Sequence, residues 1–154
     1  MDRSRAEYWM REALEEARRA GDEGEIPIGA VLLINEKIVA RGHNRSIRTH
    51  DPTAHAEILA LRHAAHSMRN YRLPGSVIVV TVEPCVMCTG ALVHARIEEI
   101  IYGAADPKGG AIDSCFRLGS SDQLNHHIEC TGGILADECA APLKEFFVSR
   151  RAGY

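Results

Sequence analysis

Residues 76–88 read SVIVVTVEPCVMC, and this stretch decides the fold because it joins a buried strand to a helix that begins with two cysteines. Residues 76–82 are almost continuously apolar and rich in β-branched side chains, which is typical of a strand covered on both faces. Pro84 is expected in the first helical turn, where proline removes no intrahelical hydrogen bond. The following helix is predicted to run from Pro84 to about Arg96.

The segments before this strand predict a helix and a hairpin. Ser4–Glu7 has the spacing of a capping box, and apolar residues follow at helical intervals as far as a turn at residues 21–24. Residues 26–34 and 37–40 are rich in strand-forming residues, so they are predicted to pair as a hairpin about Asn35–Glu36.

The remaining segments continue the alternation of helices and strands. An arginine-rich loop is expected at residues 41–50, and Asp51-Pro52 is expected to cap and open the next helix. Residues 97–103 are predicted to form a strand and residues 134–151 a long closing helix. The glycine- and serine-rich residues 106–127 match no regular element.

This order of elements describes a three-layer α/β/α sandwich, with helices on both faces of one sheet. Right-handed crossovers would make the strands around Val80 and Ile100 parallel neighbours. Pro142 interrupts the closing helix, and proline removes a backbone hydrogen bond, so a kink or an early end is predicted there.

Composition bounds the class of protein. A chain of 154 residues with 45% hydrophobic and 25% charged residues is expected to form a single domain, residues 1–154. No apolar stretch approaches the roughly 20 residues that span a bilayer, so no membrane association is expected. Five cysteines without a secretion signal indicate reduced thiols and a cytoplasmic protein. A net charge of -3 argues against non-specific coating of nucleic acid, which leaves local basic patches at Arg41, Arg45, Arg48, Arg150 and Arg151.

Two cysteines and one histidine form a candidate metal site. Cys85 and Cys88 are three residues apart on the predicted helix, where unpaired N–H groups and the helix dipole favour thiolates. Two thiolates suit zinc, and the best third ligand in the chain is His55. Taken alone, the cysteine pair also fits buried thiols or a redox pair, and His55 alone also fits a structural histidine.

Taken together, these residues form H-x-E at positions 55–57, then 26 residues, then P-C-x-x-C at positions 84–88. That order and spacing are the signature of zinc deaminases that act on nucleobases, in which the glutamate carries protons without binding metal. Three protein ligands leave a fourth position for water, as in catalytic zinc sites. Residues two apart on a helix point about 200° from each other, so His55 and Glu57 converge only if zinc lies beyond two helix N-termini.

At these residues the chain resembles the cytidine-deaminase-like superfamily and, within it, the bacterial tRNA-specific adenosine deaminases. The resemblance covers nearly the whole chain, including IPIGAVL, GHNR, HDPTAHAEILALR, VTVEPCVMCTGALVHARI, YGAADPKGGA, LNHHIE and FFVSRR. It implies a mixed central sheet of about five strands, one Zn²⁺ per subunit and a homodimer. The implied reaction is hydrolytic deamination of the wobble adenosine to inosine in the tRNA anticodon loop, with release of ammonia.

The resemblance also assigns roles residue by residue. It implies metal ligation by His55, Cys85 and Cys88, proton transfer by Glu57, and substrate binding by Asn44, Asp106, Lys108, Asn125, His126, Phe147 and Arg150. Several of the substrate-binding residues also fit purely structural roles. Asn44 also fits an Asx turn at the end of a strand, the loop residues also fit a solvated loop, and one of Phe146 and Phe147 fits the core.

Two other functions share part of this pattern. A deaminase of a free nucleobase or nucleotide, of guanine or cytosine type, would use the same zinc motif. A structural-zinc interaction module would instead close the fourth coordination position and release no ammonia. The basic C-terminal sequence FFVSRR and the arginines of residues 41–48 favour the tRNA substrate. An apolar helix face at Ala91, Leu92 and Ile97 is consistent with a dimer interface or with ordinary core packing.

Overall fold

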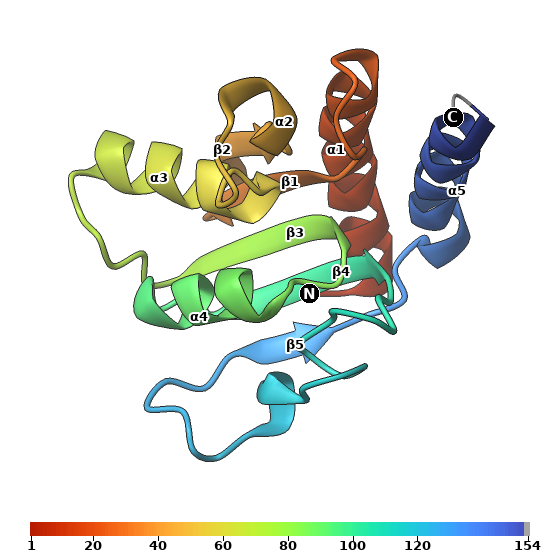
Figure 1. The fold of residues 1–154 in the computed structure, drawn as a ribbon. Coiled ribbons are helices and arrows are strands. Elements are labelled where there is room, and N and C mark those ends of the chain that lie inside the picture. The colour runs from red at the N-terminus through yellow and green to blue at the C-terminus, as the bar shows by residue number, and fades with distance from the viewer. Residues whose placement is uncertain (153–154) are drawn as a thin grey trace.

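The computed structural model describes residues 1–152, which form one mixed sheet between two layers of helices (Figure 1). In chain order the elements are α1 (Arg3–Asp22), β1 (Gly29–Ile34), β2 (Lys37–His43), α2 (Ser46–Thr49), α3 (Ala56–Met68), β3 (Ser76–Val82), α4 (Val86–His94), β4 (Glu99–Ala104), η1 (Leu118–Ser120), β5 (Glu129–Thr131) and α5 (Ala136–Ala152). The five strands lie in the order β2-β1-β3-β4-β5. The predicted three-layer α/β/α sandwich with about five strands is therefore confirmed.

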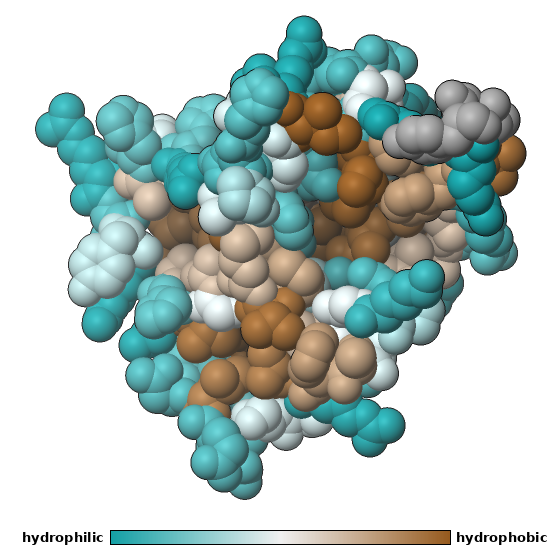
Figure 2. Space-filling view, in the orientation of Figure 1, coloured by the Kyte–Doolittle hydropathy of each residue, from teal (hydrophilic) through white to brown (hydrophobic). Residues whose placement is uncertain are grey.

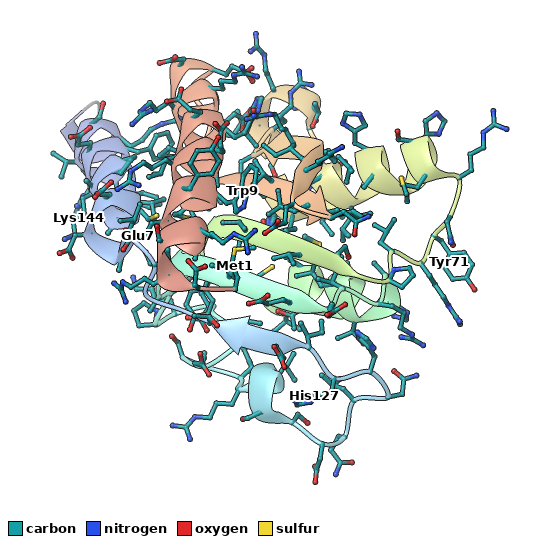
Figure 3. All side chains as sticks on the ribbon, turned by 180° about the vertical axis from the view of Figure 1, so that it is seen from behind. Met1, Glu7, Trp9, Tyr71, His127 and Lys144 are labelled. Carbon is teal, nitrogen blue, oxygen red and sulfur yellow. The ribbon has the colours of Figure 1, made fainter. Side chains whose placement is uncertain are left out.

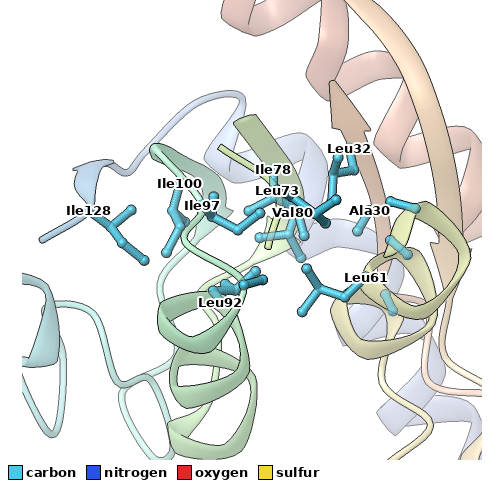
Figure 4. Close-up of a cluster of buried hydrophobic side chains, with 14 of the residues drawn as sticks. Ala30, Leu32, Leu61, Leu73, Ile78, Val80, Leu92, Ile97, Ile100 and Ile128 are labelled. Atoms are coloured by element: carbon cyan, nitrogen blue, oxygen red, sulfur yellow. The ribbon is translucent and has the colours of Figure 1, made fainter. Parts of the chain in front are cut away.

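The two faces of the sheet carry separate apolar cores, because successive strand residues point to opposite sides. On β1, Ala30 and Leu32 face the core under α3 and α4, whereas Val31 and Leu33 face the core under α1 and α5. Figure 4 shows the first core, in which Leu61 of α3 and Leu92 of α4 meet the strand side chains. Helices α1 and α5 lie next to each other on the second face (Figure 1).

Strand β3 lies at the centre of the sheet, as its apolar run predicts. Ile78, Val79 and Val80 are fully buried, and burial of each such side chain stabilises the fold by about 1.5 to 3 kcal/mol. β3 pairs antiparallel with β1 and parallel with β4, where Val80 lies opposite Tyr102. The predicted parallel crossover is confirmed, and the carboxyl ends of β3 and β4 meet at one edge of the sheet.

The hairpin of β1 and β2 also forms as predicted. Asn35 and Glu36 connect the strands with φ angles of 50° and 60°, and positive φ at both positions matches the twist of a two-residue hairpin. β2 continues to His43, and the short helix α2 follows within the segment expected to be a loop.

The helix α3 begins four residues later than expected. Asp51 does not cap it; instead, the Asp51 carboxylate accepts hydrogen bonds from the backbone N–H and the hydroxyl of Thr53, at 2.8 and 2.7 Å, and closes a separate turn. Helix α3 starts at Ala56, with His55 in the extended N-cap position. The predicted start at Asp51-Pro52 was wrong because a local side-chain turn competes with the helix there.

The start of α4 was also placed too early. Pro84 lies before the helix, where its carbonyl accepts a hydrogen bond from the N–H of Ala111 at 2.8 Å. Cys85 is the N-cap, with φ -77° and ψ 178°, and the helix begins at Val86. A hydrogen bond from a loop distant in sequence therefore holds Pro84 outside the helix.

Three further differences concern the ends of the chain. The cap of α1 is Asp2, whose side chain accepts the N–H of Arg5 at 2.9 Å, instead of the box at Ser4–Glu7. β5 lies just beyond the segment that matched no element and completes the sheet through parallel pairing with β4. Pro142 lies inside α5 and does not end it.

All five cysteines, which lie within the described part of the chain, are free thiols. Among residues 1–152, no helix combines the length and apolar character needed to cross a membrane.

Gly42 sets how closely β2 approaches α3, and its substitution is our first prediction. A Cβ atom there would lie 2.3 Å from the carbonyl oxygen of Ala56 and 2.8 Å from the N–H nitrogen of Ala60. Gly42→Ala should therefore lower the free energy of unfolding by about 2 to 3 kcal/mol, measured by urea denaturation. Gly21→Ala is the control, since its Cβ would meet only Pro27 at 3.6 Å, and it should be neutral or stabilising by up to about 1 kcal/mol. Equal stability of the two variants would contradict this account.

Candidate active site

Three potential metal ligands meet where α3 and α4 begin. His55 is the N-cap of α3, Cys85 is the N-cap of α4, and Cys88 lies in the first turn of α4. The Nδ1 atom of His55 is 3.6 Å from Sγ of Cys85 and 3.5 Å from Sγ of Cys88. All three ligand atoms lie within 4.8 Å of one another. The expected convergence beyond two helix N-termini is therefore present.

These distances fit a tetrahedral zinc ion. Zn–N distances of about 2.1 Å and Zn–S distances of about 2.3 Å at a tetrahedral angle place nitrogen and sulfur about 3.6 Å apart. The two observed separations of Nδ1 from sulfur are 3.5 and 3.6 Å. Within residues 1–152, the cluster contains one histidine and two cysteines and no fourth such ligand. This donor set leaves one tetrahedral position for water or substrate, as catalytic zinc sites do.

Contacts within the cluster prepare one sulfur atom, that of Cys85, to bind metal. A hydrogen bond from Cys88 lowers the pKa of the Cys85 thiol to about 4, and His55 contributes to the same effect. The interaction with Cys85 in turn raises the pKa of His55 and of Cys88. The group therefore holds a thiolate at neutral pH, and thiolate is the form that binds zinc.

Glu57 lies in the first turn of α3 and is only 4% exposed. Burial raises its pKa to about 7, and the neighbouring Cys85 acts in the same direction. His55 acts in the opposite direction, because a nearby positive charge favours the carboxylate. A carboxyl group with a pKa near neutrality can both accept and return a proton, which is what general acid–base catalysis requires.

Asn44 connects the end of β2 to this site. It is 6% exposed, and its Oδ1 atom accepts the N–H of Ala56 at 2.8 Å, which satisfies one free donor in the first turn of α3. Within residues 1–152, no hydrogen bond uses its Nδ2 atom. Asn44 therefore fixes the helix that carries His55 and Glu57, and its amide nitrogen stays available to a ligand.

A groove of about 710 Å³ lies at the carboxyl end of β3, and its lining includes Ile28, whose carbonyl accepts the N–H of Asn44 at 3.2 Å. Its apolar lining begins at Val82, three residues before Cys85, and continues across the sheet edge to α5. The full lining comprises Ile26, Ile28, Val82, Ala105, Asp106, Lys108, Leu143, Phe147, Arg150 and Arg151. Figure 2 shows apolar side chains recessed between polar ones on this face. The structure thus brings together Asp106, Lys108, Phe147 and Arg150, four of the residues expected to bind substrate.

The aromatic and basic residues of α5 form one wall of the groove. Phe147 is 47% exposed, whereas the neighbouring Phe146 is half-buried and lies under the guanidinium of Arg150, 4.8 Å from the ring centroid. Arg150 also donates a hydrogen bond to the carbonyl of Gly24 at 2.7 Å. Despite Pro142, α5 therefore carries Phe147 and Arg150 to the groove.

Asn125 and His126 lie elsewhere. His126 is in the segment before β5, where its Nε2 atom is 2.8 Å from the carbonyl oxygen of Ile97, and Asn125 is exposed. Helix α5 forms one wall of the groove. In Figure 3 His127, the neighbour of His126, is well separated from Lys144 of that helix. Neither Asn125 nor His126 lines the groove, so their contact with substrate stays a prediction.

The arginines of residues 41–48 are engaged within the chain. Arg41 contacts Glu12 at 2.7 Å and the buried Glu16 at 3.5 Å, and Arg48 contacts Glu23 at 3.3 Å. These carboxylates neutralise much of the positive charge that suggested a nucleic-acid patch. The basic contribution of this segment to substrate binding is therefore smaller than its sequence suggests.

Glu83 is a buried residue that sequence reasoning missed. It is 3% exposed and lies between β3 and Pro84, where its carboxylate accepts hydrogen bonds from the loop after β4. Burial alone would raise its pKa, but hydrogen bonds from Ser114 and from backbone N–H groups hold the pKa below its ordinary value. An acidic residue directly after an apolar strand was the available signal.

Comparison with known proteins places this site in a family. Residues 3–104 match the family described as the cytidine and deoxycytidylate deaminase zinc-binding region. A tRNA-specific adenosine deaminase from Haemophilus influenzae is 50% identical over 146 residues, which cover 94% of this chain and 84% of that protein. Another from Bacillus subtilis is 43% identical over 92% of this chain and 88% of that protein.

Solved structures give the same picture and one contrast. A structure from a study of A-to-I editing by tRNA:A34 deaminases matches with a TM-score of 0.85 and 44% identity, over 88% of this chain and 99% of that one. A guanine deaminase from Nitrosomonas europaea matches with a TM-score of 0.77 and 28% identity, over 92% of this chain and 84% of that one. The fold therefore accommodates more than one nucleobase substrate.

Removal of a metal ligand is our second prediction. His55→Ala and Cys88→Ser should each lower zinc affinity by at least about tenfold, since substitution of residues that merely orient ligands already costs that much. Zinc per chain after dialysis against a weak chelator, measured by atomic absorption, tests this. Cys115→Ser removes an exposed thiol outside the cluster and should retain zinc like the unsubstituted chain. Full zinc retention in His55→Ala would refute the assignment.

Proposed function

The chain belongs to the zinc-binding cytidine and deoxycytidylate deaminase family and, within it, to the tRNA-specific adenosine deaminases; on that premise we propose that it converts the wobble adenosine of a tRNA anticodon loop to inosine. The observation that carries this function is the meeting of His55, Cys85 and Cys88 close to the buried carboxyl of Glu57. A groove lined by Val82 and α5 is available for substrate. The chemistry is hydrolytic, and its second product is ammonia.

The reaction divides between the metal and Glu57. Zinc held by His55, Cys85 and Cys88 would supply Lewis acidity, which lowers the pKa of water at the fourth position. The Glu57 carboxylate would take one proton from the attacking water and deliver it to ring nitrogen N1 as the water oxygen bonds to C6. Glu57 would then carry the proton of the new C6 hydroxyl to the exocyclic nitrogen, so that the bond from C6 to that nitrogen breaks, the C6 carbonyl forms and ammonia leaves. The pKa of about 7 suits both transfers.

The groove suits a single-stranded RNA loop around the reacting base. C6 of adenine is inaccessible inside a duplex or stack, so the target nucleotide must be unpaired and turned out into the pocket. Phe147 offers an exposed ring for stacking, and Lys108 and Arg150 offer cations for phosphates. These local contacts are compatible with a net charge of -3. Asn44 would hydrogen-bond the nucleoside through Nδ2.

Assembly and location follow from the family resemblance. We propose a homodimer of single-domain chains, residues 1–154, with one zinc ion per chain, in the cytoplasm. Leu92 and Ile97, considered for the dimer interface, are fully buried in the chain's own core and lend it no support. Contacts of Asn125 and His126 with the RNA are likewise proposed from the resemblance.

Guanine deamination is the second candidate, because a guanine deaminase shares this fold. The two candidates use the same zinc chemistry and differ in what fills the groove. A free base would leave the wall of Phe147 and Arg150 unused, whereas an RNA loop would engage it. The exposed aromatic ring therefore favours the RNA substrate.

Substrate choice is our third prediction. The zinc-loaded chain should convert an anticodon stem-loop with adenosine at the wobble position to the inosine form, with an equal amount of ammonia. The same stem-loop with guanosine at that position, free guanine and free cytosine should yield no ammonia above background. Inosine is scored by nucleoside chromatography. Activity on free bases alone would overturn the tRNA assignment, and ammonia from none of the substrates would favour a structural zinc site.

Our fourth prediction separates proton transfer from metal binding. Glu57→Gln keeps the side-chain shape but cannot carry a proton, so kcat should fall by at least about 10²-fold while zinc per chain stays unchanged. Glu129→Gln, at an exposed position on β5, is the control and should retain full activity. Single-turnover kinetics and atomic absorption measure the two properties. Substantial residual turnover would remove Glu57 from its role.

A further inference from the structure

We propose that Glu83 is a positioning residue, whose carboxylate links the metal-binding turn to the loop after β4 and holds the Asp106–Lys108 wall of the groove against the RNA. This inference rests on the proposed function and deepens it. Glu83 lies two residues before the ligand Cys85 and directly after Val82, which lines the groove. Its carboxylate also contacts Asp106, another residue of the groove lining.

The carboxylate collects donors from both ends of the loop. Oε1 accepts the backbone N–H of Asp106 at 3.1 Å and the hydroxyl of Ser114. Oε2 accepts the backbone N–H groups of Ile112, Asp113 and Ser114 at 3.1, 2.8 and 3.0 Å. Hydrogen bonds to a charged acceptor are about twice as strong as neutral ones. The Glu83 side chain therefore connects both ends of the segment 106–114 through hydrogen bonds.

The segment 106–110 is held in a compact turn next to the Glu83 carboxylate. Asp106 accepts the N–H groups of Lys108 and Gly109 through Oδ1, at 3.1 and 3.2 Å, so the groove wall is built on the residue that Glu83 holds. A Cβ atom at Gly110 would lie 2.4 Å from the carboxyl carbon of Glu83. The backbone at Gly110 therefore lies so close to the Glu83 carboxylate that a residue with a Cβ atom would clash with it.

A second hydrogen bond ties the same loop to the metal-binding turn. The N–H of Ala111 donates to the carbonyl of Pro84 at 2.8 Å, and the loop is also held by the hydroxyl of Tyr102, which donates to Asp113 at 2.6 Å. Pro84 and Tyr102 can keep the loop near the site after Glu83 is changed. Loss of the Glu83 carboxylate should therefore loosen the groove wall while the zinc ligands stay in place.

The test is Glu83→Gln in the zinc-loaded, full-length chain. A glutamine amide has one acceptor oxygen, and its NH₂ group would face backbone donors, so several of the hydrogen bonds are lost. We expect KM for the anticodon stem-loop to rise about tenfold, with kcat within about threefold and zinc content unchanged. Hydrogen exchange of the amides of residues 112–114 should speed up by a similar factor. Glu83→Asp retains a carboxylate, so its KM should lie between those of Glu83→Gln and the unsubstituted chain.

Ser114→Ala and Ser120→Ala form a milder matched pair in case Glu83→Gln does not fold. Ser114 donates to Glu83, whereas within residues 1–152 the Ser120 hydroxyl bonds only to the nearby carbonyl of Arg117. Ser114→Ala should raise KM by about twofold to fivefold, and Ser120→Ala should leave it unchanged.

Three outcomes have distinct meanings. An unchanged KM in both Glu83→Gln and Ser114→Ala overturns the proposal while the unsubstituted chain still edits RNA. A fall in kcat or zinc content at constant KM also overturns it, since Glu83 would then act on the metal site. Failure of the unsubstituted chain to act on RNA, with normal exchange protection at residues 112–114, overturns the proposed function instead.

Discussion

The structure depends on one constraint: three donor atoms from two helix N-termini must meet at the distances of a tetrahedral metal site. His55 and Cys85 are both N-cap residues, so their extended backbones turn the side chains off the helix axes and towards each other. The parallel crossover from β3 to β4 and the packing of α3 and α4 on one face bring these ends to the same place. The cores on both faces stabilise that placement, which individual local contacts could not.

Two buried glutamates, Glu57 and Glu83, have pKa values shifted in opposite directions by their surroundings. For Glu57, burial outweighs the stabilising effects of His55, Cys88 and a backbone hydrogen bond, so its pKa rises to about 7, which suits a proton carrier. Glu83 has a similarly small exposed surface but lies less deeply in the protein and receives several hydrogen-bond donors, which hold its pKa low and keep it an acceptor. The difference between the two pKa values therefore follows from both the depth of each carboxylate and the number of donors around it.

Under the proposed function, substrate choice rests on the groove. The match to a guanine deaminase at a TM-score of 0.77 shows that the same fold also occurs in a deaminase named for another nucleobase. In this chain the groove is extended by α5, which brings an exposed aromatic ring and two arginines to its rim. The arginines of residues 41–48, in contrast, are balanced by glutamates of α1 and of the following turn.

The sequence by itself determined those features that depend on near neighbours along the chain. The apolar run of β3, the hairpin turn at Asn35–Glu36 and the helical spacing of α1 are local patterns, and they predicted the layers correctly. The spacing of His55, Glu57 and P-C-x-x-C predicted the metal site, since the chemistry of zinc admits few ligand sets. The resemblance to a known family added substrate contacts that local patterns could not supply.

Only the tertiary structure decided features that depend on partners distant in sequence. A hydrogen bond from Ala111 holds Pro84 just before α4, and the hydrogen bonds of the Glu83 carboxylate come from donors about thirty residues away. Leu92, predicted as part of a dimer interface, is buried in the chain's own core. Arg41, predicted as part of a basic patch, is paired with Glu12. Burial and hydrogen-bond satisfaction are properties of the folded arrangement, so no sequence window contains them.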